Sequence, residues 1–411
     1  GKANLTENKI IYPMKNILFF LCILSCVSIS PSCHAETNGY KIFGEVTTVD
    51  NQTVKGYITW GNRQMYWTDI FHADKLNNPY AHYFKNSGVQ FINNTMQSST
   101  PPTHVFICRF GNIKSIRQNT YNRVELQVKD GNIIDLTKGK HLDIGVSLNV
   151  YSPSEGNTNI HWEKISKIEF MEADQPDNRL HDVPITGIVK TSQGIYKGII
   201  TWNNDKRTQN ALLDGMTSSG KNSVPFHSIR QITKTNNACK IALKEGRELE
   251  MWGSNDINNQ NRGILVSMPN IGTVYIPWKN FEMFEAVGLN EVRMLSYNDF
   301  TAPKRLSGSV KMKNGQTQQG ILVFDLDEAM NFEILDGSND NISYAIPFKY
   351  VKSIEPKNYK YSFITLTNNG ALSLGDKEDV DARNSGLLIF SPNETPVYVP
   401  WKEVEQVTFQ N

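Results

Sequence analysis

A short phrase that recurs six times constrains the fold of this chain more than any other feature. Each copy has an aromatic residue, an apolar residue three positions later and another apolar residue three positions after that. A further apolar residue lies two positions before each aromatic, so a strand of period two would place both on one face. The steps of three suit a single tight helical turn that leads into a closing strand. The copies are Phe110/Ile113/Ile116, Trp162/Ile165/Ile168, Phe226/Ile229/Ile232, Trp278/Phe281/Phe284, Phe348/Val351/Ile354 and Trp401/Val404/Val407.

A second motif, a glycine followed by alternating apolar residues, opens three long units at Gly56, Gly198 and Gly320. The chain therefore predicts three tandem repeats, at 40–173, 183–288 and 305–411, each made of two related halves. Short strands, Gly and Asn turns and one helical turn before the last strand predict an all-β fold. In this prediction each repeat is a pair of small SH3-like or Sm-like β-barrels.

The first 35 residues predict an export signal. From Met14, one lysine precedes an apolar stretch that is short for a membrane span, and small residues come before Glu36. We expect cleavage after Ala35 and a periplasmic or secreted protein. The alternative is an envelope lipoprotein, because Ile-Leu-Ser before Cys26 resembles a lipobox and would leave a lipid anchor at Cys26. No other stretch is long and apolar enough to span a bilayer.

The charge and the cysteines exclude some classes of protein. Lys and Arg number 42 and Asp and Glu number 41, and a nearly neutral chain argues against a nucleic-acid partner, which needs a basic face. Beyond the leader, Cys108 and Cys239 occupy apolar positions of expected strands. They predict buried thiols rather than a disulfide.

The sequence contains no recognisable catalytic, metal or cofactor motif. It has no G-x-S-x-G, no Walker loop and no G-x-G-x-x-G between a strand and a helix. The eight histidines lack metal-ligand spacing. Acidic runs at 325–328 and 376–381 favour solvated turns, with weak calcium binding as the alternative, since neither has the pattern of an EF-hand. Asp143, Asp256 and Asp379 recur once in each repeat, which predicts a turn or cap role.

The first repeat alone carries a long insertion, at 72–103, and loops of this length tend to be functional or disordered. Aromatic residues in and just before it have few counterparts in the other repeats. Exposed aromatic rings stack on sugars and anchor protein interfaces. The alternative is that these rings pack the insertion onto its own repeat. The candidate partner-binding residues are Tyr66, Trp67, Tyr80, Tyr83 and Phe84.

The runs YITWGNRQMYWTDIFHADK (57–75) and FICRFGNIKSI (106–116) resemble exported bacterial proteins that have repeated small β-barrels and no assigned activity. The run IPWKNFEMF (276–284) is similar to the last strand of PRC-barrel and Sm-like folds. The resemblance implies a fold and brings no activity. RNA binding, the habit of Sm-like proteins, is not carried over, because of the expected export signal and the neutral charge.

The sequence therefore predicts an exported, non-enzymatic binding or scaffold protein of the bacterial cell envelope, without a cofactor. Its partner would be a protein or a glycan, contacted mainly through the first repeat. One alternative is an envelope hydrolase that acts on glycan, for which carboxylates or histidines would converge between repeats with shifted pKa values. The other alternative is a structural spacer.

Overall fold

The computed structural model describes residues 39–410, except 62, 94–95, 142, 175–176 and 178–182. The expected leader, with its cleavage site after Ala35 and the alternative lipid anchor at Cys26, lies outside the described residues. The described residues belong to one compact unit. None of their helices has the length and apolar character needed to cross a bilayer.

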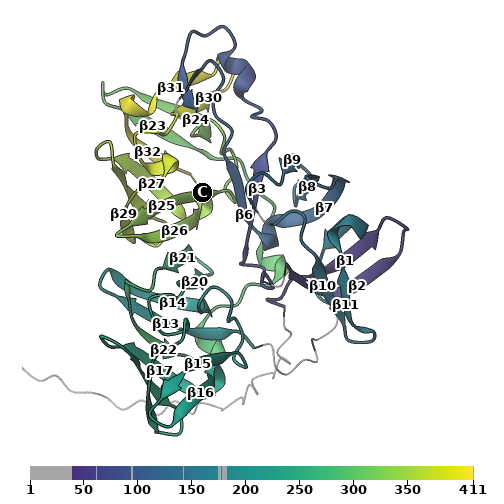
Figure 1. The fold of residues 1–411 in the computed structure, drawn as a ribbon. Coiled ribbons are helices and arrows are strands. Elements are labelled where there is room, and N and C mark those ends of the chain that lie inside the picture. Colours follow the sequence, from purple (N-terminus) through teal and green to yellow (C-terminus); the bar gives the residue numbers. More distant parts are fainter. Residues whose placement is uncertain are drawn as a thin grey trace, which may run out of the picture. The chain divides into compact units, whose positions relative to one another are not determined.

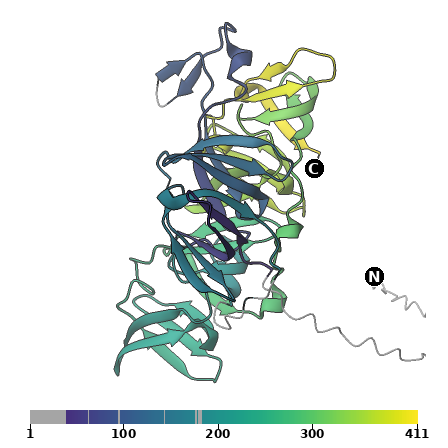
Figure 2. The same ribbon diagram turned by 90° about the vertical axis from the view of Figure 1, so that its right-hand side faces the viewer.

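The described chain is all-β, as predicted (Figures 1 and 2). Its strands pair antiparallel, and its helical elements are single 3-10 turns of three or four residues. Five of the six aromatic phrases form such a turn between two strands, and the sixth, at Trp278, forms a hydrogen-bonded turn. All six aromatic rings are buried. The predicted local structure of the phrase is therefore confirmed.

The first segment, residues 43–170, forms a ten-stranded sheet in the order β11-β10-β2-β1-β12-β7-β8-β9-β3-β6. Strands β4 and β5 form a separate hairpin. The strands are β1 (Phe43–Thr48), β2 (Thr53–Trp60), β3 (Ile70–Lys75), β4 (Phe91–Asn93), β5 (Met96–Ser98), β6 (Val105–Arg109), β7 (Ile113–Thr120), β8 (Arg123–Val128), β9 (Ile133–Thr137), β10 (Leu148–Ser152), β11 (Gly156–Ile160) and β12 (Ile165–Phe170).

The second segment, residues 185–286, pairs in the order β21-β20-β14-β13-β22-β17-β18-β19, and β15 and β16 form a separate hairpin. Its order matches that of the first segment from β11 to β9. The strands are β13 (Ile185–Thr191), β14 (Gly194–Thr201), β15 (Leu212–Thr217), β16 (Gly220–Pro225), β17 (Ile229–Lys234), β18 (Cys239–Leu243), β19 (Glu248–Met251), β20 (Ile264–Met268), β21 (Gly272–Ile276) and β22 (Phe281–Ala286).

The third segment, residues 307–409, pairs in the order β31-β30-β24-β23-β32-β27-β28-β29-β25-β26. Strand β26 also pairs with β21 of the second segment. The expected small barrels are not confirmed, because no closed barrel is found among the described residues. The strands are β23 (Ser307–Met312), β24 (Thr317–Phe324), β25 (Ile334–Asn339), β26 (Ile342–Pro347), β27 (Val351–Pro356), β28 (Tyr361–Leu366), β29 (Ala371–Gly375), β30 (Leu387–Phe390), β31 (Val397–Val399) and β32 (Val404–Phe409).

One aromatic contact organises the core of each segment. The ring at the end of β2 or β24, or directly after β14, packs against the Trp of the segment's second phrase, with centroid distances of 6.1, 5.9 and 5.6 Å. The pairs are Trp60–Trp162, Trp202–Trp278 and Phe324–Trp401. Cys108 and Cys239 are free and buried, as predicted.

The insertion at 72–103 begins with the last residues of β3, which pair within the first segment, and its later part packs on the third segment. It holds the 3-10 turn η1 (Ala81–Phe84) and the β4–β5 hairpin. The rings of Phe84 and Phe91 share a small apolar cluster with Val323, Leu326 and Leu388. Near its ends, Asn78 donates to the carbonyl of Leu326 and the N–H of His104 donates to Asp327, in the turn that follows β24.

Candidate cation site

The aromatic residue at the end of β2 or β24, or directly after β14, is followed each time by a tight reversal of the backbone. The residue four positions later donates its N–H to the carbonyl of the aromatic residue, at 3.2 Å from Gln64, 2.9 Å from Lys206 and 2.9 Å from Glu328. Each pair also forms an isolated antiparallel bridge. We name these reversals the first, second and third corner, at residues 60–64, 202–206 and 324–328.

The corners require backbone conformations that most residues avoid. Asn203 and Asn204 have φ of 52° and 60°, and Asp325 and Leu326 have φ of 46° and 60°. Asn and Asp tolerate this left-handed region better than other non-glycine residues do. Leu326 is the exception. Its buried side chain contributes to the apolar cluster that holds the insertion, and this packing offsets the strain.

Each corner faces one of the recurring aspartates, and each aspartate accepts a backbone N–H from the following strand. The distances are 2.8 Å from His72 to Asp143, 2.8 Å from Asp214 to Asp256 and 2.7 Å from Asp336 to Asp379. All three aspartates are buried. The three aspartates therefore share a structural contact that ties the corner to the next strand.

The corners differ in the groups that meet the aspartate. In the first corner, Gln64 Nε2 donates to Asp143 Oδ1 at 2.8 Å. In the second, Asn203 Nδ2 donates to Asp256 Oδ1 at 2.9 Å, and Lys206 Nζ lies 3.3 Å from Asp256 Oδ2.

In the third corner, Asp325 stands in the place of Asn203, and Glu328 stands in the place of Lys206. Carboxylate oxygens of Asp325, Glu328 and Asp379 all lie within 4.8 Å of one another. An amide and an amine of the second corner are thus replaced by two carboxylates.

These carboxylates are buried, so the interpretation of 325–328 as a solvated turn is wrong. Asp325 is 0 % exposed, Glu328 5 % and Asp379 7 %. The reason is the insertion, which covers the corner. Burial raises the pKa of the Asp325 carboxyl to about 8 despite the nearby His104, and it raises the pKa of Glu328 and Asp379 as well.

Two cations reach the cluster from the first segment, at the two ends of the insertion. Lys75, the last residue of β3, places Nζ 2.9 Å from Glu333 Oε1 and 3.3 Å from Asp327 Oδ1. Burial lowers the pKa of Lys75, but attraction to Glu333 and Asp327 outweighs burial and holds it above its usual range.

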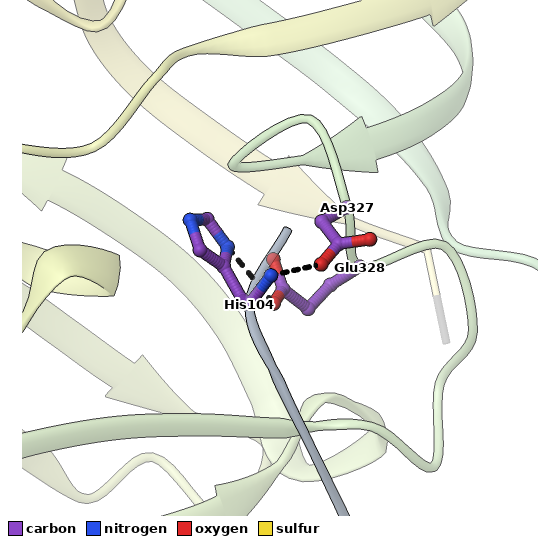
Figure 3. A group of neighbouring side chains, drawn as sticks. All are labelled: His104, Asp327 and Glu328. Carbon is purple, nitrogen blue, oxygen red and sulfur yellow. Dashed lines mark hydrogen bonds and ion pairs between the residues drawn. The ribbon is translucent and has the colours of Figure 1, made fainter. Parts of the chain in front are cut away.

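His104 lies directly before β6 and contacts the same corner (Figure 3). Its backbone N–H donates to Asp327 Oδ2 at 2.7 Å, and its Nδ1 lies 3.5 Å from Asp325 Oδ2 and 3.6 Å from Glu328 Oε1. Burial lowers the pKa of His104, but these carboxylates outweigh burial and raise it to about 11.

The cluster has more carboxyl groups than cations. Asp325, Asp327, Glu328, Glu333 and Asp379 are buried, and the ion pairs found for them among the described residues are with Lys75 and His104. Eleven buried side-chain atoms of the described residues lack a hydrogen-bond partner, and four belong to this cluster: His104 Nδ1, Asp325 Oδ2, Asp327 Oδ1 and Glu328 Oε2. Buried charge of this kind needs protons or a cation to balance it.

The geometry suits a cation with oxygen ligands. Calcium takes oxygens at 2.3–2.6 Å, so oxygens on opposite sides of the ion are about 5 Å apart. One ion can therefore contact oxygens of all three carboxylates, which lie within 4.8 Å of one another. A second group, His104 with Asp327 and Glu328, also places its ligand atoms within 4.8 Å and offers one nitrogen. A cavity of about 390 Å³, lined in part by His104, Glu328 and Asp379, lies beside both groups.

The candidate aromatic residues lie away from this cluster. Tyr66 and Trp67 are each 1 % exposed, and the Trp67 ring packs on Tyr297 at a centroid distance of 4.7 Å. Phe84 is buried with the apolar cluster of the insertion. The burial of these three rings does not support a partner surface there.

Tyr80 is half-buried, and Tyr83 is 41 % exposed with its ring against Phe390 at 5.3 Å. Their role in partner binding stays a prediction.

Sequence reasoning missed His104 and Lys75 as members of a cluster, because they flank the insertion and follow no ligand spacing. One signal was available. Aligning the corners shows Asn203 and Lys206 replaced by Asp325 and Glu328, a reversal of charge opposite a shared aspartate. Comparison of the chain with known protein families, with curated proteins and with solved structures finds no match.

Proposed function

We propose that this protein binds a hard divalent cation, calcium first, between the carboxylates of Asp325, Glu328 and Asp379. The observation that carries the proposal is the contrast between corners. The second corner balances Asp256 with its own Asn203 and Lys206, whereas the third presents two carboxylates to Asp379 in the same backbone frame. An external cation supplies the charge that the chain itself supplies in the second corner.

Two backbone donors point at the carboxylates of the proposed site. The backbone N–H of Ser385 donates to Asp325 Oδ1, and the N–H of Asp336 donates to Asp379 Oδ2 at 2.7 Å. Hydrogen bonds of this kind favour the ionised carboxylate. Burial nevertheless raises the pKa of both carboxyls, so a cation displaces protons when it binds, and these backbone donors help to stabilise the anionic form that ligates a metal.

The glycan hydrolase remains the second candidate, because carboxylates and a histidine converge with raised pKa values, as that alternative predicts. A general acid must come within hydrogen-bond distance of its substrate. Asp325 has no exposed surface, and its carboxylate oxygens lie among protein groups. This burial favours the cation site over acid–base catalysis.

The wider role that we propose is that of an exported, non-enzymatic binding or scaffold protein of the cell envelope, periplasmic or secreted. Its partner would be a protein or a glycan. We also propose that its three segments are tandem repeats of paired SH3-like units. Support comes from the pairing order shared by the segments and from the three corners with their aspartates. Calcium sites are common in extracellular modules, where the ion is abundant.

Isothermal titration calorimetry on chelator-stripped protein tests the cation site. We expect one calcium per chain, with weaker binding of Mg²⁺, which keeps its waters and demands stricter geometry. The variant Asp325→Asn/Glu328→Lys rebuilds the second corner and should fold without binding calcium. Absence of heat with calcium, or equal calcium binding by this variant, would contradict the proposal. Preference for Zn²⁺ over calcium would also contradict it and would assign the His104 group instead.

A further inference from the structure

A second set of buried polar atoms without partners gathers around another cavity, which shares Ile107, Asp336 and Lys377 with the cavity beside the cation site. Of the eleven such atoms in the described chain, five belong to residues that line a cavity of about 470 Å³. Buried donors and acceptors without partners are costly, so their collection around one cavity indicates that polar groups, of water or of a ligand, fill it. The atoms are Gln64 Oε1, Thr68 Oγ1, Arg207 Nε, Ser267 Oγ and Thr273 Oγ1.

The floor of this cavity is one face of a continuous sheet. Strands β14, β20, β21 and β26 lie side by side, and the pairing of β21 with β26 carries the sheet from the second segment into the third. Two rows of paired residues cross these strands, and all of them line the cavity. The rows are Ile199–Ser267–Thr273–Ala345 and Thr201–Leu265–Tyr275–Ser343.

The chemistry of this floor is mixed. Hydroxyl groups of Thr201, Ser267, Thr273 and Ser343 lie beside the ring of Tyr275 and short aliphatic side chains. Neighbouring hydroxyls both donate and accept hydrogen bonds, and an aromatic ring packs against apolar C–H faces. A sugar ring presents both kinds of surface at once.

The wall is supplied by the first segment, and its surplus charge is positive. Three acids line the cavity: Asp69 pairs with Arg207, Asp143 accepts from His72 and Gln64, and Asp336 lies near Lys377. Lys140 is exposed and has no ion pair within the described residues. Arg63 and Lys377 lie at 3.9 and 3.7 Å from their carboxylates, so both pairs are loose.

We propose that this cavity binds a short saccharide that carries a carboxylate. The hydroxyl rows and Tyr275 receive the sugar ring, and Lys140 with Arg63 attracts its carboxylate. The volume lies within the range of small-ligand sites. The inference does not depend on calcium, because none of these residues belongs to the three-carboxylate group.

Titration calorimetry with two defined probes tests the proposal: a trimer of galacturonic acid and a hyaluronan tetrasaccharide, each beside its neutral methyl ester. We expect at least one acid probe to bind at about 1 mM or below, and its ester to bind about tenfold more weakly. The experiment uses the full chain, both with calcium and after chelation, so failure of the cation site would leave this result intact.

Matched variants locate the site. Lys140→Glu should weaken the acid probe about tenfold, whereas Lys114→Glu, an exposed change on β7 outside the cavity, should not alter its affinity. Ser267→Val/Thr273→Val removes hydroxyls without changing charge and should weaken acid and ester alike. The proposal fails if neither acid probe binds at about 1 mM, if the esters bind as tightly as the acids, or if Lys140→Glu and Lys114→Glu have the same effect.

Discussion

The second and third corners have nearly the same backbone and opposite electrostatics. In both, a buried aspartate accepts a strand N–H at 2.7–2.8 Å, and the chain passes through two left-handed residues. Lys206 lies opposite Asp256 in one corner, and Glu328 lies beside Asp379 in the other. The comparison teaches that the negative charge in one backbone conformation can be balanced by an amine of the chain or, as we propose, by an external cation.

The largest expected effect comes from giving the second corner the charges of the third. Asn203→Asp/Lys206→Glu buries two further carboxylates beside Asp256 and removes their cation. Stranding buried charge of this kind costs about 3–5 kcal/mol, so the free energy of unfolding should fall by that order in chelator. Calcium should restore part of the loss, because the frame now resembles the third corner.

Urea unfolding with and without calcium measures both effects. Lys206→Gln is the control, since it removes the amine without adding an acid. Its free energy of unfolding should fall less, and the fall should be the same with and without calcium. If the double variant is as stable as the natural protein in chelator, the claim that Asn203 and Lys206 balance the charge of Asp256 is contradicted.

The reverse change, Asp325→Asn/Glu328→Lys, should make the third corner independent of calcium. Calcium at 100 times its dissociation constant should stabilise the natural protein by about 2.7 kcal/mol and this variant by nothing measurable. Thermal unfolding at several calcium concentrations checks this. Asp376→Asn, a nearby exposed residue, should keep the full calcium response, and loss of the response there too would show that the effect is not specific to the cluster.

Without a cation, the stability of the natural protein should fall as pH rises. The pKa of Asp325 is raised from 3.8 to about 8 by burial, so the folded state holds a proton that the unfolded state has lost. The stability from this proton is complete below pH 3.8 and is lost as pH rises through about 8. Because other carboxylates titrate in the acid range, the region from pH 6 to 9 is the informative one.

Urea unfolding in chelator should therefore show a decline over that range, and calcium should flatten it. The variant Asp325→Asn/Glu328→Lys should lack the decline. An equal decline in the variant would assign the pH dependence to other groups.

The smallest effect is expected in the first corner. Gln64→Ala removes the amide that donates to Asp143 at 2.8 Å, and a lost hydrogen bond to a carboxylate costs about 1.5–3 kcal/mol. Arg63, at 3.9 Å from Asp143 and partly exposed, limits the loss to the low end. The change should be the same with and without calcium, and a calcium-dependent difference would indicate that the first corner also binds the ion.

The sequence predicted the local structure well because local pattern determines it. The spacing of Phe110, Ile113 and Ile116 specifies a turn and a strand face wherever it occurs, and the recurrence of Asp143, Asp256 and Asp379 indicated a shared structural role. Burial depends on distant parts of the chain. The acidic run at 325–328 is polar by sequence and buried in the fold, because an insertion about 230 residues earlier covers it.

The dependence of burial on distant contacts also explains why the sequence did not reveal the surroundings of Trp67 and His104. Trp67 has no aromatic counterpart in the other segments, which suggested a surface role. It packs instead against Tyr297, from a link between the second and third segments, at a centroid distance of 4.7 Å. His104 reaches Glu328 only because β6 follows the insertion, and no spacing in the sequence predicts that contact.

The most direct measurement is anomalous X-ray scattering from crystals grown with calcium. We predict one peak at about 2.3–2.6 Å from carboxylate oxygens of Asp325, Glu328 and Asp379, and no peak beside Asp256, where Lys206 already supplies the charge. An empty third corner, or calcium in both corners, would contradict the claim that the exchange of Asn203 and Lys206 for Asp325 and Glu328 converts an internally balanced frame into a cation site.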